Sequence, residues 1–318
     1  MVDYTICYKE QLQPDAYFAA HTFDLFCAAL TSDDRAHILF DKANAHRKQW
    51  LVLPEYKFNS AEIPQGSYTH DIGTGEADYI AGFLDAAGLT PNSKLCIDIT
   101  GLLAPYLLFL LRALAAKKIF NFEVLYAEPG KYLESEETKF SGEVVREVRQ
   151  VYGFEGSHIP DTSGDLLVLG AGYDHQLLKM VAMSKEGARV VEIFGMPALR
   201  ADMYQENILR ASRASAALGR GAGDHQDNHL VPAHDPFMTA TTLSKISESS
   251  RFTNLYLCPL ATKPQVLGFG IYYLHECLNK PVSIVYPFCD VFPQKTSVGI
   301  GRVWCYSAEL ELNGPVSP

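Results

Sequence analysis

One stretch of this chain occurs twice, and that repeat limits the folds open to it. Residues 23–34 and residues 164–175 each place an apolar strand before a turn of small residues and a helix. Asp24 and Asp165 stand at the same point of the two runs, and a second apolar run ends 29 residues after each of them. Matching order and spacing indicate two units of one kind in tandem.

The repeat continues through a second set of segments. Each set has a strand, a helix containing a proline and another strand, at 95–100, Pro105 and 124–126 in one copy and at 255–259, Pro264 and 284–286 in the other. The two prolines are 159 residues apart, whereas the aspartates of the first set are 141 residues apart. The second copy therefore has an insertion of about 18 residues.

Apolar runs and the breakers between them predict alternating strands and helices in both halves. In the first half we expect strands at 22–30, 49–54, 94–100 and 121–127, and helices at 33–47, 74–88 and 103–117. In the second half we expect strands at 165–170, 188–194, 254–259 and 282–287, and helices near 175–185, 200–217, 236–248 and 264–279. The strands are nearly continuous apolar runs, as in parallel sheets covered on both faces. The predicted fold is α/β, with two tandem Rossmann-like units that have mainly parallel sheets and an internal duplication.

The domain boundaries follow from this layout. The first Rossmann-like domain is expected at 1–133 and the second at 164–318. Between them, the acidic and polar segment 134–163 is expected to be a linker or surface excursion. The insertion is expected near 219–235, in a loop rich in glycine.

Composition excludes several classes of protein. A net charge of −10 over 318 residues argues against a surface that binds duplex nucleic acid. The first residues lack the layout of a signal peptide, and the most apolar helix, 102–116, is shorter than the roughly 20 residues that a membrane span needs. We therefore expect a cytoplasmic protein with no membrane segment. Its seven scattered cysteines are expected to be reduced core residues.

A candidate anion site lies where a buried strand leads into a helix at Thr262 and Lys263. The hydroxyl, the ammonium and the first N–H groups of the helix can converge on one anion. Thr100 and Gly101 occupy the corresponding edge in the first copy. The competing interpretation is that Thr262 caps the helix and Lys263 is solvated.

These strand-to-helix junctions, in a duplicated Rossmann-like chain, resemble those of the CARF and SAVED ligand-sensing domains of prokaryotic antiviral defence systems. The resemblance implies a cyclic oligonucleotide or other nucleotide ligand at the carboxyl edges of the sheets, facing Thr100, Gly101, Thr262 and Lys263. The first copy lacks the lysine, and the second has Ala261 where the family has glycine. Such a sensor needs a separate effector or partner protein.

Charged residues also follow the first strand of each copy. Asp33 or Asp174 can hold ribose hydroxyls, and Arg35 can meet a phosphate. The alternative is that these acids cap the following helices.

A second hypothesis is an S-adenosylmethionine- or nucleotide-dependent enzyme. Residues 166–174 resemble the first motif of Rossmann-type methyltransferases, with Gly172 in the turn and Glu192 on the next strand as the candidate ribose ligand. The competing interpretation is a sharp turn that uses glycine for backbone freedom.

Three further features are weaker. Lys295 and Arg302 flank a segment whose N–H groups can bind phosphate, or which forms a hairpin. His225, His229, His234 and nearby aspartates are potential metal ligands, but their spacing and glycine content favour a polar loop, so no metal is expected. No nucleophile elbow or phosphate-binding loop motif is present in the sequence.

The expected function is therefore a non-catalytic sensor or complex subunit that binds a small anionic, nucleotide-derived molecule at the carboxyl edges of its sheets. The methyltransferase-like enzyme and a purely structural subunit of a multiprotein complex remain as alternatives, and whether the chain is an enzyme is left open.

Overall fold

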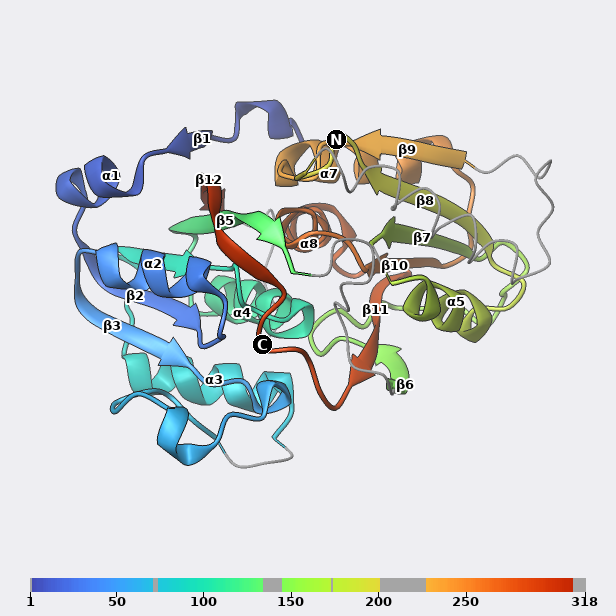
Figure 1. Cartoon of the computed structure of the whole chain (residues 1–318). Coiled ribbons are helices and arrows are strands. Elements are labelled where there is room, and N and C mark those ends of the chain that lie inside the picture. The colour runs from blue at the N-terminus through green and yellow to red at the C-terminus, as the bar shows by residue number, and fades with distance from the viewer. Residues whose placement is uncertain (1, 71–73, 134–144, 173, 201–226, 311–318) are drawn as a thin grey trace. The chain divides into compact units, whose positions relative to one another are not determined.

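The computed structural model describes residues 2–70, 74–133, 145–172, 174–200 and 227–310. They form two compact units, each built on one six-stranded sheet. The first unit comprises Cys7–Thr138 with Val291–Pro318, and the second comprises Lys139–Asp290 with Met1–Ile6. Figure 1 shows the helices and strands of both units.

The first sheet has the order β1-β12-β5-β4-β2-β3. Its strands are β1 (Lys9–Leu12), β2 (Phe23–Ala29), β3 (Ala45–Leu51), β4 (Leu95–Asp98), β5 (Asn121–Tyr132) and β12 (Ser297–Glu309). The neighbouring strands β3, β2, β4 and β5 are parallel to one another, while β12 runs antiparallel to both β5 and β1. Every residue of β4 is buried, as expected for a central strand of a covered sheet.

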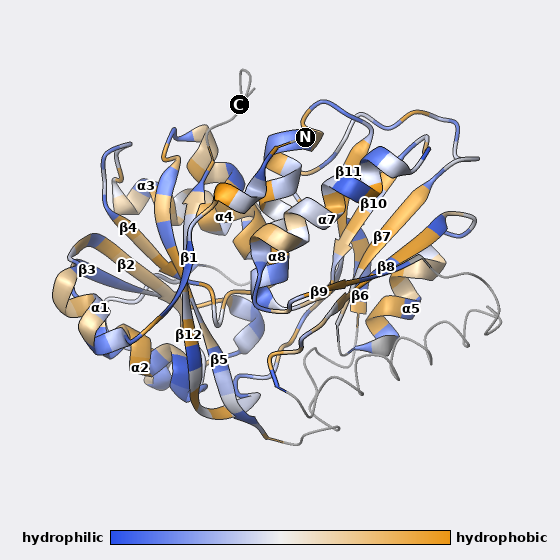
Figure 2. Ribbon diagram, turned by 90° about the horizontal axis from the view of Figure 1, so that it is seen from above, coloured by the Kyte–Doolittle hydropathy of each residue, from blue (hydrophilic) through white to orange (hydrophobic). Residues whose placement is uncertain are grey.

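Helices cover both faces of the first sheet. They are α1 (Pro14–Ala20), α2 (Asp34–Lys42), α3 (Glu76–Ala87) and α4 (Ala104–Ala116). Figure 2 shows α1 and α2 on one face and α3 and α4 on the other. On the α1/α2 face the core includes Phe18, Phe26 and Leu39, none of them more than 3% exposed. Burial of these large apolar side chains stabilises the layered arrangement.

The second sheet has the order β6-β11-β10-β7-β8-β9. Its strands are β6 (Val145–Gln150), β7 (Leu166–Ala171), β8 (Arg189–Gly195), β9 (Asp227–Val231), β10 (Leu255–Pro259) and β11 (Val282–Cys289). All are parallel except β6, which pairs antiparallel with β11. The helix α5 (His175–Ser184) covers one face, and α7 (Pro236–Ser249) and α8 (Lys263–Tyr272) cover the other (Figure 2).

Five neighbouring strands of each sheet follow the same order, which confirms the predicted α/β architecture of two Rossmann-like units. The parallel series β3-β2-β4-β5 corresponds to β8-β7-β10-β11. In both, an antiparallel strand then pairs with the last member of the series. That strand is exchanged between the copies, because β6 follows β5 in the chain but pairs with β11, and β12 follows β11 but pairs with β5.

The exchange makes the two units differ from the domain ranges expected from the sequence. Residues 145–150 were expected in a linker and instead form β6 at an edge of the second sheet. Residues 297–309 were expected in the second domain and instead form β12, inside the first sheet. Helix α2 ends at Lys42, and β3 begins at Ala45, within the range expected to be helical.

Two further observations concern the whole described chain. No disulfide joins the seven cysteines, and six of them are buried. None of the helices in the described segments is both long and apolar enough to cross a membrane.

Candidate functional site

Each sheet has a point where the chain changes direction across it. After β2 the chain continues outward to β3 and then returns to the other side of β2 as β4, and after β7 it likewise continues to β8 and β9 before returning as β10. In open α/β sheets ligands bind outside the carboxyl ends of the strands at such switch points. The turns that follow β2, β4, β7 and β10 contain most of the residues singled out in the sequence.

At the first switch point Thr100 is buried, and its hydrogen bonds are made with other residues of the protein. Its Oγ1 accepts a hydrogen bond from the amide of Ala127 at 3.0 Å, and its own amide donates to Asp98 Oδ1 at 2.9 Å. Asp98 is fully buried, and this burial raises its pKa to about 6 against the opposing effects of Thr100 and Arg35. Its Oδ2 has no hydrogen-bond partner. Thr100 thus ties β4 to β5 beside a buried acid.

Asp33 and Arg35 form a buried ion pair at the same edge. Arg35 donates to Asp33 Oδ2 at 2.9 Å and to the carbonyl of Ala127 at 2.9 Å. Asp33 does not cap α2. Its Oδ1 instead accepts from the amides of Thr296 and Ser297, at 3.1 and 2.9 Å. The pair therefore anchors the start of β12 to the turn after β2.

Gly101 allows the turn after β4 to pack against the turn after β2. A Cβ at this position would lie 2.7 Å from Thr31 Cγ2 and 3.0 Å from the carbonyl oxygen of Ala29. The carbonyl of Gly101 accepts a hydrogen bond from Tyr56 Oη at 2.7 Å. The turn after β2 therefore packs directly against Gly101, a residue expected to face a ligand.

Lys295 and Arg302 both belong to the first unit and both form ion pairs. Lys295 lies 3.2 Å from Asp34, and Arg302 lies 2.8 Å from Glu128. Glu128 is buried and also accepts from Trp304 Nε1 at 2.8 Å. The two cations flank Gly299 in the sequence, a residue of β12 whose φ of 69° favours glycine.

At the second switch point Thr262 precedes the first residue of α8. Its hydroxyl donates to the carbonyl of Ala233 and lies 3.2 Å from Gln265 Oε1, which also accepts from the amide of Thr262 at 3.4 Å. Gln265 is 1% exposed, and its Nε2 has no hydrogen-bond partner. Lys263, the first residue of α8, is partly buried. The second switch point thus has a half-buried cation beside an unsatisfied buried donor.

Gly172 and Asp174 complete this edge. A Cβ on Gly172 would overlap the carbonyl oxygen of Leu260, at 1.7 Å, so this glycine lets the turns after β7 and β10 meet. Asp174 caps α5 by accepting from the amides of Gln176 and Leu177, both at 3.1 Å. Capping, the alternative considered for Asp174, is what the structure shows. Its carboxylate orients the first turn of α5 towards the edge.

The remaining candidates are placed as follows. Glu192 lies inside β8 and is buried, three residues before Gly195, the last residue of the strand. Residues 201–226, with the expected helix near 200–217 and His225, lie outside the described residues. Asp235 caps α7 through the amides of Phe237 and Met238. No cluster of three or more potential metal ligands occurs within the described ranges.

Two residues of these edges were missed in the sequence. Gln265 lies in a range predicted only as helix, and Asp98 begins the segment Asp98–Gly101 at the first edge, but the sequence pattern assigns neither residue a role. Their signal is positional: each is a polar residue in an otherwise apolar run next to a switch point, at 95–100 and 264–274.

No protein-family model, curated protein or solved structure matches this chain. The geometry of the two edges is therefore what distinguishes the possible functions.

Proposed function

We propose that this protein is a non-catalytic sensor or complex subunit that binds a small anionic, nucleotide-derived molecule at the carboxyl edge of the second sheet. The observation that carries the proposal is the unsatisfied Nε2 of Gln265, a buried donor next to Thr262 and Lys263 at the switch point. Buried donors are rarely left unpaired in native proteins, so the simplest explanation for the unpaired Nε2 of Gln265 is that a bound ligand supplies its acceptor.

Helix geometry supports an anionic ligand at this place. Helices α5, α7 and α8 all follow parallel strands and so begin at the same edge of the sheet. Their N-termini carry partial positive charge, and the ammonium of Lys263 adds a full charge at the start of α8. A phosphate would meet a positive field here, as at many helix N-termini.

The first sheet is a poorer candidate because its edge is occupied by the protein. Asp33 and Arg35 hold β12, and the Thr100 hydroxyl is bonded to β5. Side chains that anchor strands cannot be redirected to a ligand without loss of those contacts. We therefore assign ligand binding to the second copy and a supporting role to the first.

Burial of Glu192 weighs against the methyltransferase-like alternative. A carboxylate that holds a ribose must stand at the tip of its strand, whereas Glu192 is 5% exposed and lies within β8. The role of sensor in antiviral defence, and a cyclic oligonucleotide as its ligand, come from the resemblance to CARF and SAVED domains. They define the first compounds to test.

Thermal unfolding with a ligand panel tests the proposal. The panel contains cyclic oligonucleotides, mononucleotides and S-adenosylmethionine, because a ligand that binds the folded state raises its melting temperature with concentration. We expect stabilisation by a cyclic oligonucleotide, lost in Lys263→Ala and retained in Lys245→Ala, a matched exposed lysine on α7. Stabilisation by S-adenosylmethionine alone would favour the enzyme, and a Lys263→Ala variant with unchanged affinity would exclude this site.

A further inference from the structure

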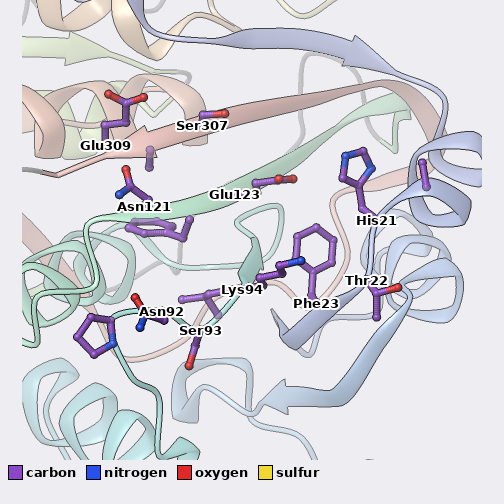
Figure 3. A pocket seen from close by; sticks show the side chains of 15 residues that line it. His21, Thr22, Phe23, Asn92, Ser93, Lys94, Asn121, Glu123, Ser307 and Glu309 are labelled. Atoms are coloured by element: carbon purple, nitrogen blue, oxygen red, sulfur yellow. The ribbon is translucent and has the colours of Figure 1, made fainter.

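A pocket opens at the opposite, amino edge of the first sheet (Figure 3). Its volume is about 540 Å³, and it lies where β2, β4 and β5 begin and β12 ends. Polar side chains that line it include His21, Lys94, Asn121, Glu123, Ser307 and Glu309. A pocket of this size and polarity suits a small part of a larger partner as well as a small molecule.

The second sheet contains an equivalent position, which the strand registers identify. Leu25 pairs with Leu95 in the first sheet, as Leu166 pairs with Leu255 in the second. Lys94, just before β4, therefore corresponds to Asn254, just before β10. Their neighbours agree, because Asp24 accepts from the amide of Lys94 at 2.8 Å and Asp165 accepts from Nδ2 of Asn254 at 2.8 Å.

In the second sheet the protein's own segment 156–161 lies at this position. Asn254 is fully buried, and both the oxygen and the nitrogen of its side-chain amide bind that segment. Its Oδ1 accepts from the amide of Ile159 at 2.8 Å, and its Nδ2 donates to the carbonyls of Ile159 and Asp161 at 3.2 and 3.1 Å. The segment is thus held mainly through its backbone, as a bound peptide is held.

The fit of this segment against the sheet is close. A Cβ on Gly156 would lie 2.0 Å from the carbonyl oxygen of Val282, at the start of β11. The ring of His158 stacks on Tyr256 with centroids 4.8 Å apart. Tyr256 pairs with Ser283, which is fully buried. In one copy of the fold a segment of the chain itself therefore packs at the amino edge.

The first sheet carries a charge where the second carries Ser283. Cys96 pairs with Glu123 as Tyr256 pairs with Ser283, so Glu123 is the equivalent residue. Its carboxylate is half-buried, and desolvation raises its pKa. Cys305 Sγ approaches Oε2 at 3.7 Å, which is a weak contact for a carboxylate. A basic group in the pocket would offset this desolvation.

From these equivalences we propose that the amino-edge pocket of the first sheet binds an extended peptide segment of a partner protein, and that a basic side chain of this peptide pairs with Glu123. The segment 156–161 shows how such a peptide lies in the other copy. The net charge of −10 favours encounter with a basic partner. This site is independent of the ligand site proposed for the second sheet.

A designed peptide tests the proposal on the full chain. The probe is a fluorescent octapeptide with the sequence of residues 156–163 carrying His158→Lys, because His158 stacks on Tyr256, whose register partner Ser283 is the equivalent of Glu123. A displayed library of random octapeptides serves as a broader probe. We expect saturable binding of the octapeptide by anisotropy, enrichment of Lys and Arg from the library, and affinity about tenfold weaker in Glu123→Gln.

A second pocket variant, Ser307→Trp, and a control outside the pocket, Glu147→Gln, accompany Glu123→Gln. Ser307→Trp fills the pocket from β12 and should abolish binding, even if Glu123→Gln were to disturb folding. Glu147→Gln, which removes an exposed carboxylate of β6 in the second unit, should leave binding unchanged.

Several outcomes would overturn the proposal. These are no selected octapeptide, equal binding by the wild type and Glu123→Gln, or unaltered binding by Ser307→Trp. Binding seen only after removal of residues 311–318 would assign the pocket to this chain's own last residues. Self-association lost in Ser307→Trp would assign it to a second copy of the chain.

Discussion

Asp33 and Ser297 lie 264 residues apart in the chain, yet the amide of Ser297 donates to the carboxylate of Asp33 at 2.9 Å. This hydrogen bond fixes the start of β12 to the turn after β2. It joins the turn of the first repeated stretch to the first residue of the last strand that the structure describes. The stability of the first sheet therefore depends on a residue that sequence patterns associate with ligand binding.

Replacement of Asp33 should destabilise the protein strongly. Asp33→Ala leaves the buried Arg35 guanidinium without its ion-pair partner, and breaking buried pairs costs about 3–5 kcal/mol. Asp34→Ala is the control, because Asp34 is 40% exposed and its pair with Lys295 is worth about 0–1 kcal/mol. Urea unfolding of both variants measures the difference, and equal losses would contradict the anchoring role of Asp33.

The buried Asp98 should make stability depend on pH. Its pKa in the folded protein is about 6, above the ordinary 3.8, so the folded chain retains a proton that the unfolded chain has lost. The resulting stabilisation is fully present below pH 3.8 and is lost as the pH rises through about 6. Asp98→Asn keeps an acceptor for the amide of Thr100 without titrating.

The measurement compares the two proteins across this range. The free energy of unfolding of Asp98→Asn, relative to wild type, should increase by about 3 kcal/mol between pH 4 and pH 7, since each pKa unit corresponds to about 1.4 kcal/mol. Other carboxyl groups titrate equally in both proteins and cancel in the difference. A difference that stays constant with pH would show that Asp98 is not shifted.

Gly172 should tolerate no side chain. Gly172→Ala places a Cβ within 1.7 Å of the Leu260 carbonyl oxygen, so the turns after β7 and β10 must separate, at a cost of about 1–3 kcal/mol. Gly75→Ala is the matched control, since a Cβ there meets nothing within 4 Å. If thermal unfolding ranks the two variants equally, the contact at the second switch point is not as tight as described.

Removal of β12 should open the first sheet. A chain ending at Asp290 loses β12, which among the described strands is the one that pairs with β1, so β5 becomes an exposed edge. Hydrogen exchange of the β5 amides should become rapid, and a synthetic peptide of residues 291–310 should restore protection. A chain lacking residues 311–318 alone serves as the control, and full protection of β5 without the peptide would disprove the exchange of strands.

The parallel strands were predictable because their signal is local. Buried central strands such as β4, β7 and β10 are short apolar runs between turn residues, and the sequence identifies each within a few positions. The edge strand β3 was partly assigned to a helix, since Arg47 and Lys48 are exposed and break the apolar run. The polar β9 was missed for the same reason, because it too lies at a sheet edge.

The strand exchange could not be predicted from the sequence. β6 pairs antiparallel with β11, and β12 pairs antiparallel with β5, although the two strands of each pair are far apart in the chain. No local sequence pattern indicates which of two similar sheets such a strand joins. The candidate site shows the same limit. Motif reasoning placed Thr100, Asp33 and Arg35 at the correct edge, but their partners, Ala127 and Ser297, come from distant strands.

The exchange of β6 and β12 also has an evolutionary consequence. Each half of the gene encodes the strand that completes the sheet of the other half, so deletion of one half leaves the survivor with an unfinished edge. A duplicated chain in this state can diverge in sequence but cannot return to a single copy by simple loss. The reciprocal strands thus preserve both halves of the chain, even where their sequences diverge.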